Sequence, residues 1–370
     1  APGMRSPARV DEDRGRAAVA RDKVTKREGS SKGASSSAVL ERIAAGELNL
    51  IGIRRRAGVF CDLSEGFRRH QEDPSQFPMF RDLVKAAGCS SKGSSRNFEV
   101  DLNEAILASR AWDAERGIKA SDPKGFVFHE SRCGSTLAAN SLAVADEAHR
   151  VYSESAPIPE AVRSGEPIRM LKDAVYLMSR GEGGKPVPTF FKFQSIMTLS
   201  MDKILRAFPD VPWAFVYREP VQVMQSHFNQ QSGLRGSRTP NCAKARSSPG
   251  PEVKAVLKKY ALTPSRASTE EFCAAHLASL CETALTKFQD TSKGMLLPYE
   301  GLVESMKTKV IPDHFNVELS AAGRKRIDAI GGVYSKARTP GKEWVEDSEK
   351  KEERASGKVV KASHDILRPV

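Results

Sequence analysis

The stretch that decides the fold lies near the middle of the chain. Residues 126–140 read Phe-Val-Phe-His-Glu-Ser-Arg-Cys-Gly-Ser-Thr-Leu-Ala-Ala-Asn. An apolar run of strand length leads into a short turn of small residues, and an Ala- and Leu-rich helix follows. Such a turn points backbone N–H groups, hydroxyls and the positive end of a helix dipole at one place. This geometry binds phosphate or sulfate, and Arg132 adds a permanent cation.

Four further apolar runs of strand length follow, each before a segment with helical periodicity. They lie at residues 150–152, 189–193, 213–217 and 295–299. Strands that alternate with helices predict an α/β fold, in which helices flank a central parallel sheet in a three-layer sandwich of the P-loop NTPase type. Ligands of such sheets bind at the carboxyl ends of the strands.

The composition on either side of this pattern predicts the domain organisation. We expect a disordered basic arm at 1–37, a helical lead-in at 38–120, the α/β domain at 121–345 and a solvated, charged tail at 346–370. Residues 230–266 carry eight Lys and Arg against one Glu, a net charge of +7. This basic insertion is either a lid over the site or a solvated loop without function.

The charge of the chain favours an anionic partner. Its 370 residues include 58 Lys and Arg and 46 Asp and Glu, a net charge of +12. Nucleic acid, an acidic surface or a multiply phosphorylated small molecule would each match this excess. No run approaches the roughly 18 apolar residues of a membrane-spanning helix, so no membrane span is expected.

The cysteines indicate neither a metal site nor an obvious disulfide framework. They show no C-x-x-C pair and no His at zinc-site spacing, which favours reduced thiols in the cytoplasm and no metal. Disulfides in a secretory lumen, or a plastid location after removal of an N-terminal segment, are the alternatives. The six are Cys61, Cys89, Cys133, Cys242, Cys273 and Cys281.

A second motif follows the strand predicted at 213–217. Arg218 ends the strand, Pro220 opens a helix, and Ser226 stands eight residues after the arginine. A guanidinium binds phosphate in a bidentate manner, and a nearby hydroxyl adds a further hydrogen bond. With the turn at 132–137, in which Cys133 replaces the usual serine, this motif resembles the PAPS-dependent sulfotransferases (PAPS is 3′-phosphoadenosine 5′-phosphosulfate). The resemblance is to their bacterial and algal P-loop type, over residues 124–345.

The resemblance implies in-line transfer of a sulfuryl group from PAPS to an acceptor hydroxyl or amine, without a metal. Residues 296–302 resemble the family's Tyr-Glu-Asp-Leu segment, with Gly301 in place of the acid, and 335–344 resemble its basic loop over the nucleotide. In the family, the Arg and Ser of the second motif hold the 3′-phosphate. The expected nucleotide-binding residues are Arg132, Cys133, Gly134, Ser135, Thr136, Leu137, Arg218, Ser226, Lys336 and Arg338.

Catalysis is assigned to three residues. Glu154 follows the second strand at an offset similar to the catalytic Glu of protein-tyrosine sulfotransferases, and partial burial is expected to raise its pKa so that it acts as the base. Arg132 would stabilise the leaving oxygens, and Lys192 would bind the sulfuryl group or else extend to water. His129 and His227 are the alternative bases. Cys133, at a helix N-terminus beside an arginine, is expected to have thiolate character.

Two other functions remain open from the sequence. A P-loop kinase or nucleotide hydrolase would need the Gly-Lys-Ser/Thr of a Walker loop, which is missing here. A non-catalytic basic module would bind nucleic acid or acidic polymers through the 230–266 insertion. We expect a small-molecule or sugar-like acceptor rather than nucleic acid, and the sequence does not determine the oligomeric state.

Overall fold

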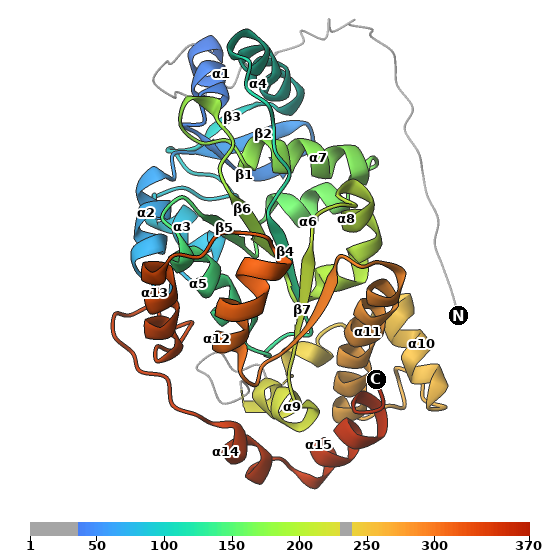
Figure 1. Cartoon of the computed structure of the whole chain (residues 1–370). Coiled ribbons are helices and arrows are strands. Elements are labelled where there is room, and N and C mark those ends of the chain that lie inside the picture. The colour runs from blue at the N-terminus through green and yellow to red at the C-terminus, as the bar shows by residue number, and fades with distance from the viewer. Residues whose placement is uncertain (1–35, 230–238) are drawn as a thin grey trace, which may run out of the picture. The chain divides into compact units, whose positions relative to one another are not determined.

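The computed structural model describes residues 36–229 and 239–370, and these form an α/β fold around a central sheet (Figure 1). The sheet has five parallel strands in the order β5-β6-β4-β7-β8. Each strand lies within one residue of its predicted bounds, so the predicted parallel sheet is confirmed. The strands are β4 (Gly125–His129), β5 (Arg150–Ser153), β6 (Thr189–Lys192), β7 (Trp213–Tyr217) and β8 (Gly294–Pro298).

Strand β4 is the centre of the sheet and is buried along its whole length. In register, Phe126 lies beside Phe191 of β6 and Trp213 of β7. An apolar strand without polar alternation is typical of a parallel sheet that is covered on both faces. Because β4 and β7 are parallel neighbours, the loops that follow them leave the sheet side by side.

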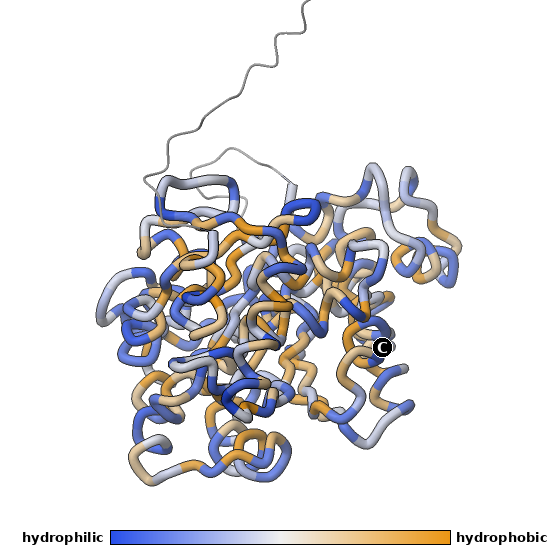
Figure 2. Tube along the Cα trace, turned by 90° about the horizontal axis from the view of Figure 1, so that it is seen from above, coloured by the Kyte–Doolittle hydropathy of each residue, from blue (hydrophilic) through white to orange (hydrophobic). Residues whose placement is uncertain are grey.

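Helices cover both faces of the sheet and complete the three layers (Figure 1). Side chains alternate along β4, so Phe128 joins one apolar cluster and Val127 joins the cluster on the opposite face. The hydrophobic parts of the trace gather toward the interior in Figure 2, and the peripheral loops are mostly hydrophilic. The flanking helices are α5 (Ser135–Ala145), α6 (Pro157–Val162), α7 (Pro167–Met178), α8 (Met201–Ala207), α9 (Pro220–Phe228), α11 (Thr269–Asp290), α12 (Leu302–Ser305) and α13 (Ala321–Gly331).

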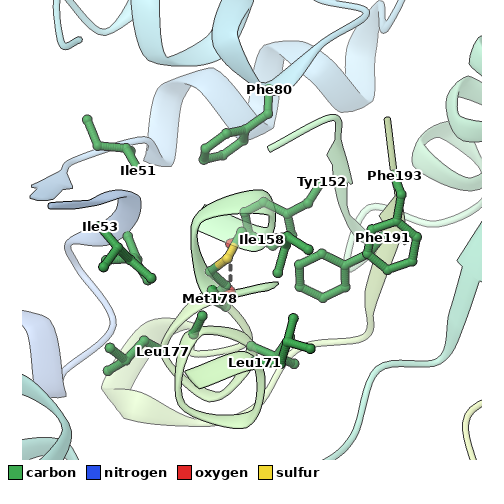
Figure 3. Close-up of a cluster of buried hydrophobic side chains, with 14 of the residues drawn as sticks. Ile51, Ile53, Phe80, Tyr152, Ile158, Leu171, Leu177, Met178, Phe191 and Phe193 are labelled. Atoms are coloured by element: carbon green, nitrogen blue, oxygen red, sulfur yellow. Dashed lines mark hydrogen bonds between the residues drawn. The ribbon is translucent and has the colours of Figure 1, made fainter. Parts of the chain in front are cut away.

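The lead-in contains a small antiparallel sheet that the sequence analysis missed. Strands β1 (Asn49–Arg54), β2 (Ala57–Cys61) and β3 (Phe98–Asp101) pair in that order. Ile53 of β1, Phe80 and Tyr152 of β5 pack in one cluster, so this sheet shares the core of the central sheet (Figure 3). The helices of the lead-in are α1 (Ser36–Ala44), α2 (Ser64–Glu72), α3 (Phe80–Ala86) and α4 (Leu102–Arg116).

Four of the six cysteines form disulfides, Cys61–Cys89 and Cys242–Cys273. The expectation of reduced thiols is therefore wrong for these four. The two remaining thiols are those of Cys133, which is buried, and Cys281, which is half-buried. Spacing alone did not reveal the pairs, because each joins elements that are brought together only by the fold.

The described part of the basic insertion, residues 239–266, packs on the flank of the α/β domain. It holds the short turn η4 (Asn241–Ala243) and helix α10 (Pro251–Lys259), and both contact α11. The Cys242–Cys273 disulfide attaches this part to α11. None of residues 239–266 lines the cavity described below, so this part is not a lid over it. Residues 230–238 of the insertion and the expected arm lie outside the described residues, apart from 36 and 37, which belong to α1.

The C-terminal tail is partly buried rather than fully solvated. Helix α14 (Ser348–Glu353) is exposed, as expected, but α15 (Gly357–Ala362) and η6 (Ser363–Leu367) pack against α11. Val359 and Ile366 are buried in the second core cluster. The sequence analysis expected a solvated tail because of its many charges, and did not identify the few apolar residues that bury part of it.

Two features are absent from the described residues. Within 36–229 and 239–370, no helix combines the length and the apolarity needed to cross a membrane. The same residues contain no cluster of three or more His, Cys, Asp or Glu side chains arranged to hold a metal ion.

Candidate active site

The turn between β4 and α5 has the backbone conformation of an anion-binding loop. Ser131, Arg132 and Gly134 have φ angles of 86°, 56° and 87°, in the left-handed region. Gly134 is required on two grounds, because its φ favours glycine and a Cβ there would lie 2.3 Å from Cδ2 of Tyr299. The N–H of Leu137 donates to the carbonyl of Gly134 at 2.8 Å, and the N-terminus of α5 directs its positive end toward the turn, which favours an anion there.

The second motif meets this turn directly. Nε of Arg132 donates a hydrogen bond to Oγ of Ser226 at 3.0 Å, across 94 residues of sequence. Arg218 lies between β7 and α9, directly before Glu219, whose side chain caps α9, and Ser226 is buried within α9. The two segments therefore converge, as the sequence hypothesis requires.

Arg218 is held in place by hydrogen bonds along its length. Its backbone N–H donates to Oε1 of Glu130 at 2.6 Å, and its Nε donates to Oε1 of Gln222 at 2.7 Å. Its guanidinium carbon lies 4.0 Å from the ring centroid of Tyr299. Burial raises the pKa of Glu130 to about 8 despite the bond from Arg218. The sequence analysis missed this buried carboxyl, which follows an apolar strand directly.

A cavity of about 250 Å³ opens between the two motifs. It is lined by most of the expected binding residues: Arg132, Gly134, Ser135, Thr136, Leu137, Arg218, Ser226 and Lys336. A larger cavity, of about 1060 Å³, shares Leu137, Arg218, Tyr299 and Trp344 with the first. The pair of cavities therefore offers space beyond a single anion, next to aromatic side chains.

Two expected binding residues do not line either cavity. The Sγ of Cys133 points into the core, where it donates to the carbonyl of Val216 at 3.0 Å, and burial raises its thiol pKa to about 12. The expected thiolate is therefore wrong. Arg338 instead pairs with Asp82, with 3.1 Å between Nη2 and Oδ2.

Glu154 and Lys192 form an ion pair at the carboxyl ends of β5 and β6. Nζ of Lys192 donates to Oε1 of Glu154, and the Lys192 side chain is fully buried. Burial alone would raise the pKa of Glu154, but the charge of Lys192 and the hydrogen bond from Lys192 lower it to about 2. The expectation of a raised pKa is thus wrong, and Glu154 is a carboxylate at neutral pH. Its φ of 57° adds a third strained non-glycine residue to the site.

Lys336 adds a half-buried cation whose charge interacts with those of Lys192, Glu154 and Arg132. It lines the cavity of Arg132, and burial together with the charges of Lys192 and Arg132 lowers its pKa to about 7. No hydrogen bond or ion pair joins its ammonium to any part of the chain that the structure describes. Cations crowded in this way are stabilised when an anion binds among them.

The two histidines are held in the neutral form, and neither lines the cavity of the two motifs. Nδ1 of His129 accepts from the N–H of Ser131 at 3.0 Å, and Nε2 lies 3.1 Å from the carbonyl of Phe193, so a neutral ring has both nitrogens occupied. Burial and the charge of Lys192 lower the pKa of His129. Burial, followed by the charge of Arg132, lowers the pKa of His227 to about 3.

Six lining residues had not been expected from the sequence: Asn229, Gly331, Val333, Tyr334, Asp347 and Lys351. Asp347 and Lys351 stand four residues apart in a run of alternating charges, which is the pattern of a solvated helix. The i, i+4 spacing of Asp347 and Lys351 is typical of an ion pair on a helix surface, but it does not indicate that the pair faces a cavity.

Two sulfotransferases are among the solved structures that are similar to this chain. No family model matches the chain, and no curated protein matches it. The sulfotransferase STF9 from Mycobacterium avium is 13% identical with a TM-score of 0.45, covering 91% of this chain and 96% of that one. A sulfotransferase domain from the curacin biosynthetic pathway is 12% identical with a TM-score of 0.38, covering 66% of this chain and 98% of that one. Neither similarity is close, so the case for a function rests on the site itself.

Proposed function

We propose that this chain is a sulfotransferase that moves a sulfuryl group from PAPS to the hydroxyl or amine of a small-molecule or sugar-like acceptor. One observation carries the proposal: two separate anion-binding motifs, the Arg132 turn and the Arg218–Ser226 pair, meet in one cavity. A donor with anionic groups at both its 5′ and its 3′ positions matches two such sites, whereas a single phosphate would use only one.

The residues of the cavity fit such a nucleotide. Four cations line it, namely Arg132, Arg218, Lys336 and Lys351. The hydroxyl oxygen of Thr136 is buried and has no hydrogen-bond partner within the described residues, as expected of a group that awaits a ligand. The larger neighbouring cavity supplies room for a nucleoside beside Tyr299 and Trp344.

Arg132 and Lys336 line the cavity of the two motifs, whereas Glu154 and Lys192 form an ion pair beyond the lining of either cavity. PAPS supplies the activated sulfuryl group and leaves as adenosine 3′,5′-bisphosphate. The Glu154 carboxylate would accept the proton of the acceptor as the new S–O or S–N bond forms. Lys192 orients that carboxylate, and Arg132 and Lys336 stabilise the charge that develops on the oxygens of the leaving group.

Glu154 is a weak base at a pKa of about 2, but binding of the donor would raise this pKa. An anion near Lys336 and Lys192 would offset the positive charge that holds the pKa of Glu154 down. The carboxylate would then become more basic only when the donor is bound. Such coupling restricts proton abstraction to the loaded enzyme.

The disulfides bear on where the protein works. Disulfides persist in oxidising compartments and are rare in the cytosol. The Cys61–Cys89 and Cys242–Cys273 bonds therefore favour a secretory lumen over the cytoplasm expected from the sequence.

Titration calorimetry with three ligands tests the proposal. Adenosine 3′,5′-bisphosphate, ATP and duplex DNA would be titrated in parallel into the full chain. We expect the bisphosphate to bind tightly, and R218A to weaken it about a hundredfold through loss of charge-assisted hydrogen bonds. R206A is the matched control, because Arg206 is 69% exposed and lies on α8, outside the cavity.

Each alternative function predicts a different result. Preference for ATP with Mg²⁺ would indicate a kinase or nucleotide hydrolase. Salt-sensitive DNA binding without any nucleotide affinity would indicate a basic binding module. Bisphosphate binding that is indifferent to R218A would remove the basis of the proposal. Labelled donor, offered with acceptors of several chemical classes, would then identify the acceptor.

A further inference from the structure

The segment of residues 344–352, called the C-terminal strap below, contributes to the cavity from far along the chain. Trp344, Asp347 and Lys351 all line the cavity. The strap is held against α9, since Nε2 of Gln222 donates to Oε1 of Glu352 at 2.6 Å. The strap therefore rests on the same helix that carries Ser226.

Asp347 lies between two cations of the site. One of its carboxylate oxygens, Oδ1, lies 2.5 Å from Nζ of Lys351 and 3.6 Å from Nη2 of Arg218. The next residue, Ser348, accepts from Nη2 of Arg218 through Oγ at 2.6 Å. Among the described residues that line the cavity, Asp347 is the one acid.

The three charged groups differ in how firmly they are enclosed. The Arg218 and Lys351 side chains are 6% and 11% exposed, whereas the Asp347 side chain is 48% exposed. The cations are fixed in the protein, and the carboxylate reaches them from the solvent side. The carboxylate is accordingly the group that an incoming anion can displace.

If the Asp347 carboxylate moves away from Arg218 and Lys351, another anion has to take its place. Burial and the charges of Arg218 and Arg132 lower the pKa of Lys351 even with Asp347 beside it. Without any anion, two enclosed cations would face each other, and such uncompensated charge is strongly unfavourable. A phosphate carries more charge than a carboxylate and has three acceptor oxygens, so it can bind both cations at once.

We propose that the Asp347 carboxylate is a resident counterion in the position of the nucleotide's 3′-phosphate, and that Lys351 binds this phosphate directly once Asp347 is displaced. This inference rests on the proposed function and adds a binding residue and a selectivity device to it. A nucleotide without a 3′-phosphate cannot displace Asp347, so the strap discriminates against adenosine 5′-phosphates.

The test compares two ligands across four proteins. Adenosine 3′,5′-bisphosphate and adenosine 5′-monophosphate are titrated calorimetrically into the wild type, D347N, K351M and E353Q. Glu353 is the matched control for D347N, because it is exposed on α14, the helix that follows Asp347, and E353Q removes the same charge. We expect D347N to tighten bisphosphate binding about tenfold, K351M to weaken it about tenfold, and both to change monophosphate binding less than twofold. E353Q should change neither ligand by more than twofold, and circular dichroism confirms that each variant is folded.

The outcomes separate the inference from the proposed function. If D347N strengthens both ligands equally, or neither, the counterion role is wrong, while R218-dependent binding of the bisphosphate still supports the nucleotide site. If K351M binds the bisphosphate like the wild type, Lys351 is not a ligand of the 3′-phosphate. If the wild type binds no bisphosphate at all, the inference and the proposed function fail together.

Discussion

The charge state of Lys336 should make nucleotide binding weaken as the pH rises above 7. Burial, then the charges of Lys192 and Arg132, lower the pKa of Lys336 to about 7 in the free protein. A bound phosphate or sulfate stabilises the ammonium form, so the pKa of Lys336 is higher in the complex. Binding therefore takes up a proton at any pH between the two values.

The magnitude follows from this linkage. Between the free and the bound pKa, the dissociation constant of the nucleotide rises tenfold for each pH unit. With a bound pKa near the ordinary 10.5, and with half of Lys336 already neutral at pH 7, affinity falls about fiftyfold from pH 7 to pH 9, which is about 2.3 kcal/mol. Below pH 7, Lys336 is already charged and contributes no slope.

Calorimetry of adenosine 3′,5′-bisphosphate at pH 7, 8 and 9 measures the effect. Buffers with different ionisation enthalpies report the protons taken up, and we expect close to one proton at pH 8.5. K336R supplies the control, because a guanidinium stays charged across this range and should abolish the slope. A wild-type affinity that is constant from pH 7 to pH 9, or a K336R variant with an unchanged slope, would refute the reasoning.

Three further predictions concern the base, the turn and the cysteines. Glu154→Gln should lower turnover 10²–10⁴-fold while leaving bisphosphate affinity within about twofold, as measured with labelled donor and by calorimetry. Because the pKa of Glu154 is about 2 in the free protein, its carboxylate should stay ionised there, so it should cause no loss of wild-type kcat/KM between pH 7 and pH 5. Gly134→Ala should lower the melting temperature by several degrees and weaken nucleotide binding, since its Cβ would lie 2.3 Å from Tyr299; Gly117→Ala, with a φ of 63° and open space around it, isolates the backbone effect. The denatured, unreduced chain should react with two equivalents of a thiol reagent and the reduced chain with six, and C242A, which opens a 31-residue loop, should cost about 3–4 kcal/mol of stability.

The sheet and the two anion-binding motifs were predictable because their signals are local. Apolar runs such as 213–217 define strands, and the Gly and Ser residues after β4 define a turn before a helix. Parallel pairing then brings the turns after β4 and β7 together without further information. Arg132, Arg218 and Ser226 accordingly lie where the sequence hypothesis needs them.

The parts that could not be predicted depend on contacts between distant segments. The pKa of Glu154 depends on Lys192, 38 residues away, and a partly buried carboxyl without that partner would have the opposite shift. The disulfides likewise depend on which elements the fold places side by side. The role of Asp347 depends on the path of the strap. Ser348 of the strap is 130 residues from Arg218 in sequence, yet the two side chains form a hydrogen bond.

Helix α5 has one more consequence for how the site responds to a ligand. Every residue of α5 except Leu137 is buried, and most are Ala or Ser packed between the sheet and its neighbours. So closely enclosed a helix leaves its N-terminal turn no freedom to adjust to the molecule that arrives. The loss of conformational entropy on binding should consequently be small at the N-terminus of α5. It should be larger at the C-terminal strap, where exposed side chains must become ordered. The rate of nucleotide binding would then depend on how quickly the C-terminal strap rearranges, because the turn between β4 and α5 does not change.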